Sequence, residues 1–215
     1  MDIESTLRKL YSPEITTEQV TEIYDKWSDN YDEVVKPSYN GPKLVLDALS
    51  EVVTDKHVRI LDCACGTGLI GETLRESGFG NIDGVDMSEG QLRIARKKGI
   101  YRKTIIAVLG PESIEGVETD SYDVITCSGS FGGGGQLNDG VLQEWTRIVK
   151  PGGYIILVVH ENYRNLVEGD TFKRLLESKA MTLVKSCFVD HYVINLDERN
   201  ARAFVYTLKV LASKP

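Results

Sequence analysis

The residues with the clearest chemical potential lie in "LDCACGTG", residues 61–68. Gly66, Gly68 and Gly71 satisfy G-x-G-x-x-G, the pattern of loops that let the phosphates of a dinucleotide approach the backbone. Asp62 stands four residues before the first of these glycines, at the end of a predicted strand. A carboxylate at that place repels a pyrophosphate. The loop therefore poses a choice between an anionic dinucleotide and a ligand with a positive charge.

A cationic ligand would instead be attracted by this carboxylate. S-adenosylmethionine carries an α-ammonium group and a sulfonium, and Asp62 is placed to pair with the ammonium while the glycines let the ligand approach the backbone. A charge-assisted hydrogen bond of this kind contributes about 1.5–3 kcal/mol, enough to affect cofactor choice. The alternative role for Asp62 is an N-cap of the following helix.

A second acid, Asp86, ends the next predicted strand in "IDGVDMS", 20 residues after Gly66. At this place in nucleotide-binding sheets an acid accepts both ribose hydroxyls, for either cofactor. Met87 would then lie against the adenine ring. The alternative role for Asp86 is a helix cap beside Ser88, although Ser88 already serves as the cap.

The elements that position these residues alternate. Short apolar runs predict strands at 58–62, 81–86, 104–109, 122–127 and 153–159, and helices are predicted at 70–77, 88–97, 139–150 and 171–178. This alternation indicates an α/β fold with a doubly wound parallel sheet. Residues 181–195 and 201–212 are two more strand-like segments, and the short link "LDERN" between them permits only antiparallel pairing.

Helices precede the first strand. Thr16 and Gln19 have capping-box spacing and begin a helix predicted over 16–30, while Asn40-Gly41-Pro42 begins a second helix; Ser88 and Gln91 have the same capping-box spacing. The 215 residues are long enough for one core. We expect a single domain over 1–215, with an N-terminal helical segment at 1–56 and a Rossmann-like core at 57–215.

Composition narrows the classes of function. The net charge of −7 argues against nucleic acid as the main partner. No stretch approaches the roughly 18 apolar residues of a spanning helix, so we expect a cytoplasmic protein without a membrane partner. The four cysteines have neither a disulfide framework nor paired metal spacing, and we expect no metal. A monomer is the default oligomeric state.

Four motifs in order, "LDCACGTG", "IDGVDMS", "YDVITCSGS" and "VKPGGYIIL", resemble the class I S-adenosylmethionine-dependent methyltransferases over roughly residues 16–160. More narrowly, "IYDKWSDNYDEVV", "LDCACGTGL" and "VLGPESI" are similar to the Williams–Beuren-region methyltransferase-like family. The resemblance implies a Rossmann-like, seven-stranded sheet, mostly parallel, with a C-terminal antiparallel hairpin. It also implies an aromatic N-terminal segment that covers the cofactor as a lid.

The resemblance assigns cofactor-binding residues. These are Tyr24, Trp27, Tyr31, Asp62, Ala64, Gly66, Thr67, Gly68, Asp86, Met87, Cys127 and Ser128. The three aromatic residues have helical spacing, so they are equally well explained as core. Ala64 stands where many class I enzymes have glycine, and we expect a slightly wider turn to accept it. No acid follows the third strand for the adenine amino group, where "LGPESI" offers only Glu112 or backbone carbonyls.

Methyl transfer from a sulfonium needs alignment and dryness more than an acid or base. A base, if one is used, should lie at the carboxyl end of the fourth or fifth strand; the candidates are Ser128, Ser130, His160, Glu161 and Tyr163. His160 is the best placed, because it ends "YIILVVH", although a structural role is the more common one for such a histidine. Gly132–Gly135 could form a lip of the acceptor pocket or a plain surface loop.

The sequence thus predicts an enzyme that transfers a methyl group from S-adenosyl-L-methionine to a small-molecule or protein acceptor, leaving S-adenosyl-L-homocysteine. Three alternatives stay open: a non-catalytic S-adenosylmethionine-binding module, an NAD-dependent oxidoreductase, and a structural interaction protein that binds neither ligand. Asp62 disfavours the oxidoreductase.

Overall fold

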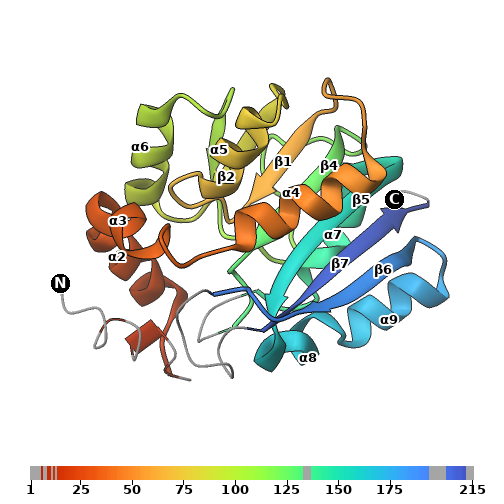
Figure 1. The fold of residues 1–215 in the computed structure, drawn as a ribbon. Helices are drawn as coiled ribbons and strands as arrows, with labels where there is room; N and C mark the ends of the chain where they lie inside the picture. Colours follow the sequence, from red (N-terminus) through yellow and green to blue (C-terminus); the bar gives the residue numbers. More distant parts are fainter. Residues whose placement is uncertain are drawn as a thin grey trace.

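The computed structural model describes residues 6, 9, 10, 12, 14–132, 137–193 and 202–211. Its centre is a seven-stranded sheet with the strand order β3-β2-β1-β4-β5-β7-β6 (Figure 1). The strands are β1 (Ile60–Cys63), β2 (Ile82–Asp86), β3 (Thr104–Ile106), β4 (Tyr122–Ser128), β5 (Val149–His160), β6 (Met181–Val189) and β7 (Ala203–Val210). The order places β1 and β4 at the centre, where the direction of winding reverses.

The sheet is mixed in the way the sequence predicts. β1 to β5 pair in parallel, whereas β7 pairs antiparallel with both β5 and β6. The α/β fold with a mostly parallel sheet and antiparallel C-terminal strands is therefore confirmed. The link "LDERN" lies outside the described residues.

Helices cover both faces of the sheet (Figure 1). The helices are α2 (Thr17–Trp27), α3 (Tyr31–Val35), α4 (Gly41–Val52), α5 (Leu69–Glu76), α6 (Glu89–Lys98), α7 (Val141–Ile148), α8 (Arg164–Val167) and α9 (Asp170–Glu177), with 3-10 turns η1 (Ser28–Asn30) and η2 (Glu161–Tyr163). One apolar cluster packs α4 and α5 against the sheet, and another packs α7 and α9 against the opposite face. None of the helices in the described ranges is long and apolar enough to span a bilayer.

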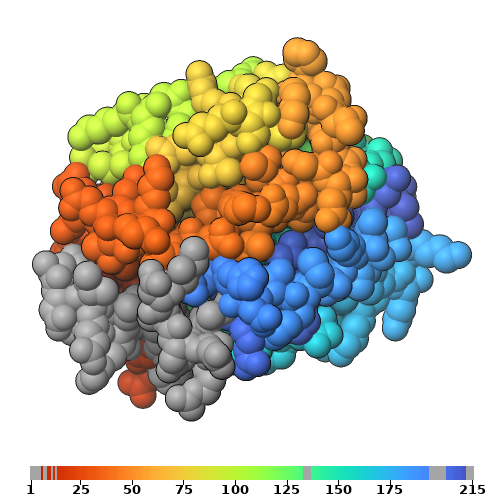
Figure 2. Space-filling view, viewed as in Figure 1, coloured from red at the N-terminus to blue at the C-terminus, as the bar shows by residue number. Residues whose placement is uncertain are grey.

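The N-terminal helices cover one end of this layer. In the space-filling view, α2 and α3 form a continuous surface with α4, α5 and α6 (Figure 2). The predicted capping box is present, because the Thr16 hydroxyl accepts from the Gln19 amide and the Gln19 side chain accepts from the Thr16 amide. The helix predicted over roughly 16–30 is present as α2, but α2 ends at Trp27 and the last three residues form the 3-10 turn η1. There the Ser28 hydroxyl donates to the Asp25 carbonyl at 2.8 Å, a local bond that competes with regular helix.

Two further boundaries differ from the prediction. The helix predicted over 139–150 spans only Val141–Ile148, and β5 begins at once with Val149. Pro151-Gly152-Gly153 therefore lie inside the strand, where the pairing of β4 with β5 shifts register between Tyr122 and Val124. The third strand is shorter than predicted, and residues 133–135 of the glycine loop lie outside the described part of the chain.

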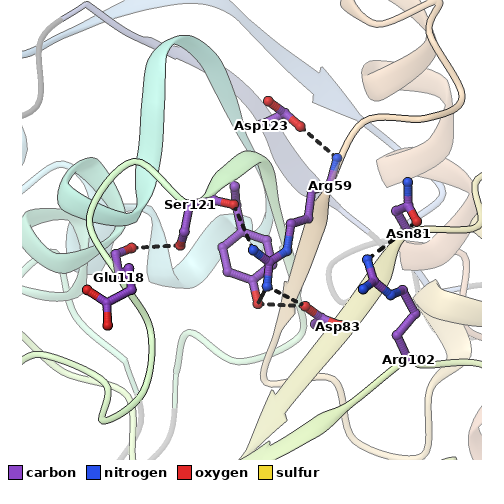
Figure 3. A network of polar contacts seen from close by, with 8 residues as sticks. Arg59, Asn81, Asp83, Arg102, Glu118, Ser121 and Asp123 are labelled. Carbon is purple, nitrogen blue, oxygen red and sulfur yellow. Dashed lines mark hydrogen bonds and ion pairs between the residues drawn. The ribbon is translucent and has the colours of Figure 1, made fainter.

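A polar network joins the amino-terminal ends of β1, β2 and β4 (Figure 3). The Arg59 guanidinium pairs with the buried Asp83 carboxylate at 3.1 Å and stacks 4.2 Å from the centre of the Tyr122 ring. The Tyr122 hydroxyl donates to the same carboxylate at 2.8 Å. In folds of this kind ligands bind at the carboxyl ends of the strands. This network lies at the opposite end of the sheet and is therefore structural.

A candidate cofactor site at the carboxyl ends of β1, β2 and β4

The turn after β1 is built from left-handed backbone. Ala64 (φ 52°), Gly66 (φ 55°) and Gly68 (φ 95°) all have positive φ, and the Cys65 amide donates to the Val85 carbonyl of β2 at 3.1 Å. The turn accommodates Ala64 because this residue adopts a left-handed conformation. Such a conformation costs an L-residue about 1–2 kcal/mol. The turn brings the start of α5 over the ends of β1 and β2.

Asp62 is fully buried between the sheet and α5. The Tyr101 hydroxyl donates to its Oδ2 at 2.6 Å and the Thr126 hydroxyl donates to its Oδ1 at 2.9 Å. Burial raises the pKa of this carboxyl to about 7, against the lowering effect of these hydroxyls. Among the described residues no Lys, Arg or His forms an ion pair with it. Gly68 occupies the N-cap position of α5, which rules out that alternative role for Asp62.

Asp86 holds the neighbouring strand end in a different way. Its Oδ2 accepts from the Gly66 amide at 2.8 Å, and its Oδ1 accepts from the Ser88 amide at 2.9 Å. Burial raises the pKa of the carboxyl. Ser88 is the N-cap of α6, as predicted, but the second capping box is incomplete, because the Gln91 amide group donates to the Tyr24 carbonyl of α2.

The three predicted lid aromatics form one cluster beside Met87. The ring centroids of Trp27 and Tyr31 are 4.9 Å apart, and that of Tyr24 lies 6.2 Å from Tyr31 and 6.3 Å from Trp27. Trp27 is 4% exposed and packs with Leu10 and Val20, so its position is that of a core residue. Tyr24 and Tyr31 are half-buried. Burial of the Tyr31 hydroxyl is the largest effect that raises its pKa, and neighbouring ionisable groups, Asp86 among them, raise it further.

Thr67, at the top of the turn, contacts the N-terminal segment. Its hydroxyl donates to Asp32 of α3, and Asp32 also pairs with Lys98 of α6, which reaches Glu72 of α5 at 3.3 Å. These contacts hold α3 against the glycine turn that follows β1. Asp32 was not predicted as a site residue, because its position beside Tyr31 is the only feature of the sequence that points to it.

The end of β4 separates two candidates. The Ser128 hydroxyl accepts from the Tyr39 hydroxyl at 2.7 Å, on the face that carries Asp62. The Cys127 side chain belongs to the cluster on the opposite face, and burial raises its pKa to about 12. The Cys127 side chain therefore lies on the other face of the sheet from Asp62, and only its backbone is available at the carboxyl end of β4.

The base candidates at the end of β5 are already engaged. His160 Nδ1 accepts from the Asn162 amide at 3.2 Å and caps the turn η2, and Glu161 pairs with Arg202 at 2.8 Å. The neutral ring has one acceptor nitrogen, so proton abstraction by His160 requires loss of this cap. The geometry favours the structural role for His160. Glu112, the candidate for the adenine contact, is exposed. Ile106, at the end of β3, pairs in register with Asp86 and is 58% exposed.

Comparisons with known proteins found similar domains and chains. Residues 61–157 match the Methyltransferase domain family. The chain is 33% identical over 163 residues to Methyltransferase-like protein 27 of Homo sapiens, a match that covers 74% of this chain and 64% of that protein. The chain thus spans less than two thirds of that relative's length.

Solved structures show the same fold at low identity. A methyltransferase in complex with the Trm112 activator of Haloferax volcanii has a TM-score of 0.66 at 14% identity, covering 91% of this chain and 99% of that one. The [4+2]-cyclase SpnF has a TM-score of 0.64 at 15% identity, covering 92% and 97%. The cyclase shows that this fold also carries other chemistry.

The strand order, the glycine turn and the two acids define the fold of the class I S-adenosylmethionine-dependent methyltransferases. Within it, the resemblance to the Williams–Beuren-region methyltransferase-like proteins is supported by the match to Methyltransferase-like protein 27.

Proposed function

We propose that this protein binds S-adenosyl-L-methionine at the edge formed by β1, β2 and β4 and transfers its methyl group to a small molecule or an exposed protein side chain. When bound, this cofactor supplies a methyl group on an already activated sulfur leaving group. The protein's task is to hold donor and acceptor in line and exclude water. We also propose a single cytoplasmic domain that acts as a monomer.

One observation carries the proposal: a fully buried carboxylate, Asp62, with no cationic partner among the described residues. Burying an unpaired charge is costly unless a partner compensates it. A carboxylate accepts about four hydrogen bonds. Two are used by Tyr101 and Thr126, and the backbone of Gly71 also stabilises the charged form. An α-ammonium group supplies the missing positive charge, whereas a pyrophosphate would add repulsion.

The remaining contacts follow from the geometry. Asp86 lies beside the Gly66 amide and is positioned to accept the ribose hydroxyls. Met87 packs against the same cluster as Tyr24 and Tyr31, so we propose that these three side chains surround the adenosine, while Trp27 supports them from the core. We place the acceptor on the side of Ser128 and Tyr39, whose hydroxyls are hydrogen-bonded to each other. No residue is assigned as an obligatory base.

Calorimetry with S-adenosylmethionine, S-adenosylhomocysteine and NAD on wild type and Asp62→Ala tests the proposal. We expect both adenosyl ligands to bind and NAD to fail, with Asp62→Ala weakening S-adenosylhomocysteine by roughly 10- to 100-fold, the worth of one hydrogen bond to a charged group. Tight NAD binding that survives Asp62→Ala would contradict the proposal and favour the oxidoreductase instead. Incubating methyl-labelled cofactor with protein and small-molecule extracts separates an enzyme from a binding module, which would bind without releasing labelled product.

A further inference from the structure

Tyr101 reaches Asp62 through an opening made by glycines. It lies in the connection between α6 and β3, and its ring lies between α5 and β2. A Cβ added to Gly71 would lie 2.7 Å from the Tyr101 ring, and one added to Gly84 would lie 2.9 Å from Cys65 Sγ and 3.0 Å from the ring. A side chain at Gly71 would displace the ring, and one at Gly84 would press on both the ring and the Cys65 thiol.

The backbone does not require glycine at either place. Gly71 lies inside α5 and Gly84 inside β2, and neither has a positive φ. A glycine inside a helix costs about 1 kcal/mol relative to alanine. Room for the Tyr101 ring is therefore the structural reason for Gly71, and room for the ring together with the Cys65 thiol is the reason for Gly84. The same residues also bring the phenol hydroxyl within 2.6 Å of Asp62 Oδ2.

We propose that Tyr101 is a positioning residue for the methyl donor, which acts through Asp62 and makes the site selective for ligands that carry an α-amino group. Its hydroxyl holds one carboxylate oxygen while Thr126 holds the other, so the carboxylate is fixed in one orientation before the ligand arrives. Tyr101 itself does not touch the ligand. This inference rests on the proposed pairing of Asp62 with the ammonium group.

The test compares two ligands that share the adenosine part. S-adenosylhomocysteine carries the α-amino group, and 5′-methylthioadenosine lacks it. In Tyr101→Phe, which keeps the ring, we expect calorimetry to show about tenfold weaker binding of S-adenosylhomocysteine and unchanged binding of 5′-methylthioadenosine. The ratio of the two affinities within each protein cancels any loss of folded fraction.

The matched control is Tyr122→Phe. It removes another buried phenol that donates to a carboxylate, Asp83, but at the opposite end of the sheet. We expect both ligands to bind this variant as they bind wild type. If Tyr101→Phe does not fold, Gly71→Ala replaces it, because the added Cβ would lie 2.7 Å from both the ring and the hydroxyl and so moves the hydroxyl away from Asp62. It should give the same selective loss.

Asp62→Asn separates failure of this inference from failure of the proposed function. If Asp62→Asn binds S-adenosylhomocysteine like wild type, the proposed pairing with the ammonium is wrong. If Asp62→Asn weakens binding and Tyr101→Phe does not, or if Tyr101→Phe weakens both ligands equally, the positioning role is wrong. The proposal expects no further loss when Tyr101→Phe is added to Asp62→Asn.

Discussion

The buried carboxylate of Asp62 should make the stability of the ligand-free protein depend on pH in an unusual direction. Burial raises the pKa of this group from 3.8 to about 7, so the folded protein holds a proton that the unfolded chain releases. Its contribution is then greatest below pH 3.8 and is lost as the pH rises toward 7. Most paired surface acids act in the opposite sense.

The perturbation that isolates this effect is Asp62→Asn, a neutral side chain of nearly the same shape. A pKa raised to about 7 corresponds to roughly 4 kcal/mol once the group is fully ionised. Between pH 5 and pH 8 we expect the free energy of unfolding of Asp62→Asn, relative to wild type, to increase by about 2–3 kcal/mol. Asp86 and the other acids titrate in both proteins and cancel in the difference.

Urea unfolding of the two ligand-free proteins at pH 5, 6, 7 and 8 measures this difference. A difference that stays flat across the series would show that Asp62 ionises in the folded protein at its ordinary pKa. The site would then have no electrostatic need for a cationic ligand. A saturating amount of S-adenosylhomocysteine should reduce the pH dependence in wild type, because the ammonium stabilises the charged form.

Other predictions concern single positions. Ala64→Gly should raise the free energy of unfolding by up to about 1 kcal/mol, since relief of the left-handed strain exceeds the added chain entropy; lower stability in thermal melts would contradict this. Asp83→Ala should lower stability by roughly 2–4 kcal/mol in urea, because it leaves Arg59 without its buried partner, yet S-adenosylhomocysteine affinity should not change in the folded variant. His160→Ala should cost about 1 kcal/mol as the cap on Asn162 is lost, with unchanged S-adenosylhomocysteine binding by calorimetry.

The layers of the fold could be predicted because burial leaves a pattern in the chain. β4, for example, is buried at nearly every position, as expected of a central parallel strand. The end of α2 could not be predicted, because the bond from Ser28 to the Asp25 carbonyl depends on one hydroxyl rotamer. The register shift at the start of β5 likewise depends on pairing with β4, which the local sequence does not encode.

The site divides in the same way. Asp62 and Asp86 could be found from their spacing around a glycine turn, because the chemistry of the turn is local. Tyr101 contacts Asp62 from 39 residues further along the chain and has no motif of its own. The available signal was indirect: Gly71 inside a helix and Gly84 inside a strand, where glycine is otherwise unfavourable, indicate a close neighbour.

The most direct test of the central claim is the structure of the complex with S-adenosylhomocysteine. We predict that the α-ammonium group lies within hydrogen-bonding distance of Asp62 and that the Asp86 carboxylate accepts both ribose hydroxyls. A complex in which the ligand's amino group points away from Asp62, or in which Asp86 contacts no ribose oxygen, would contradict the account.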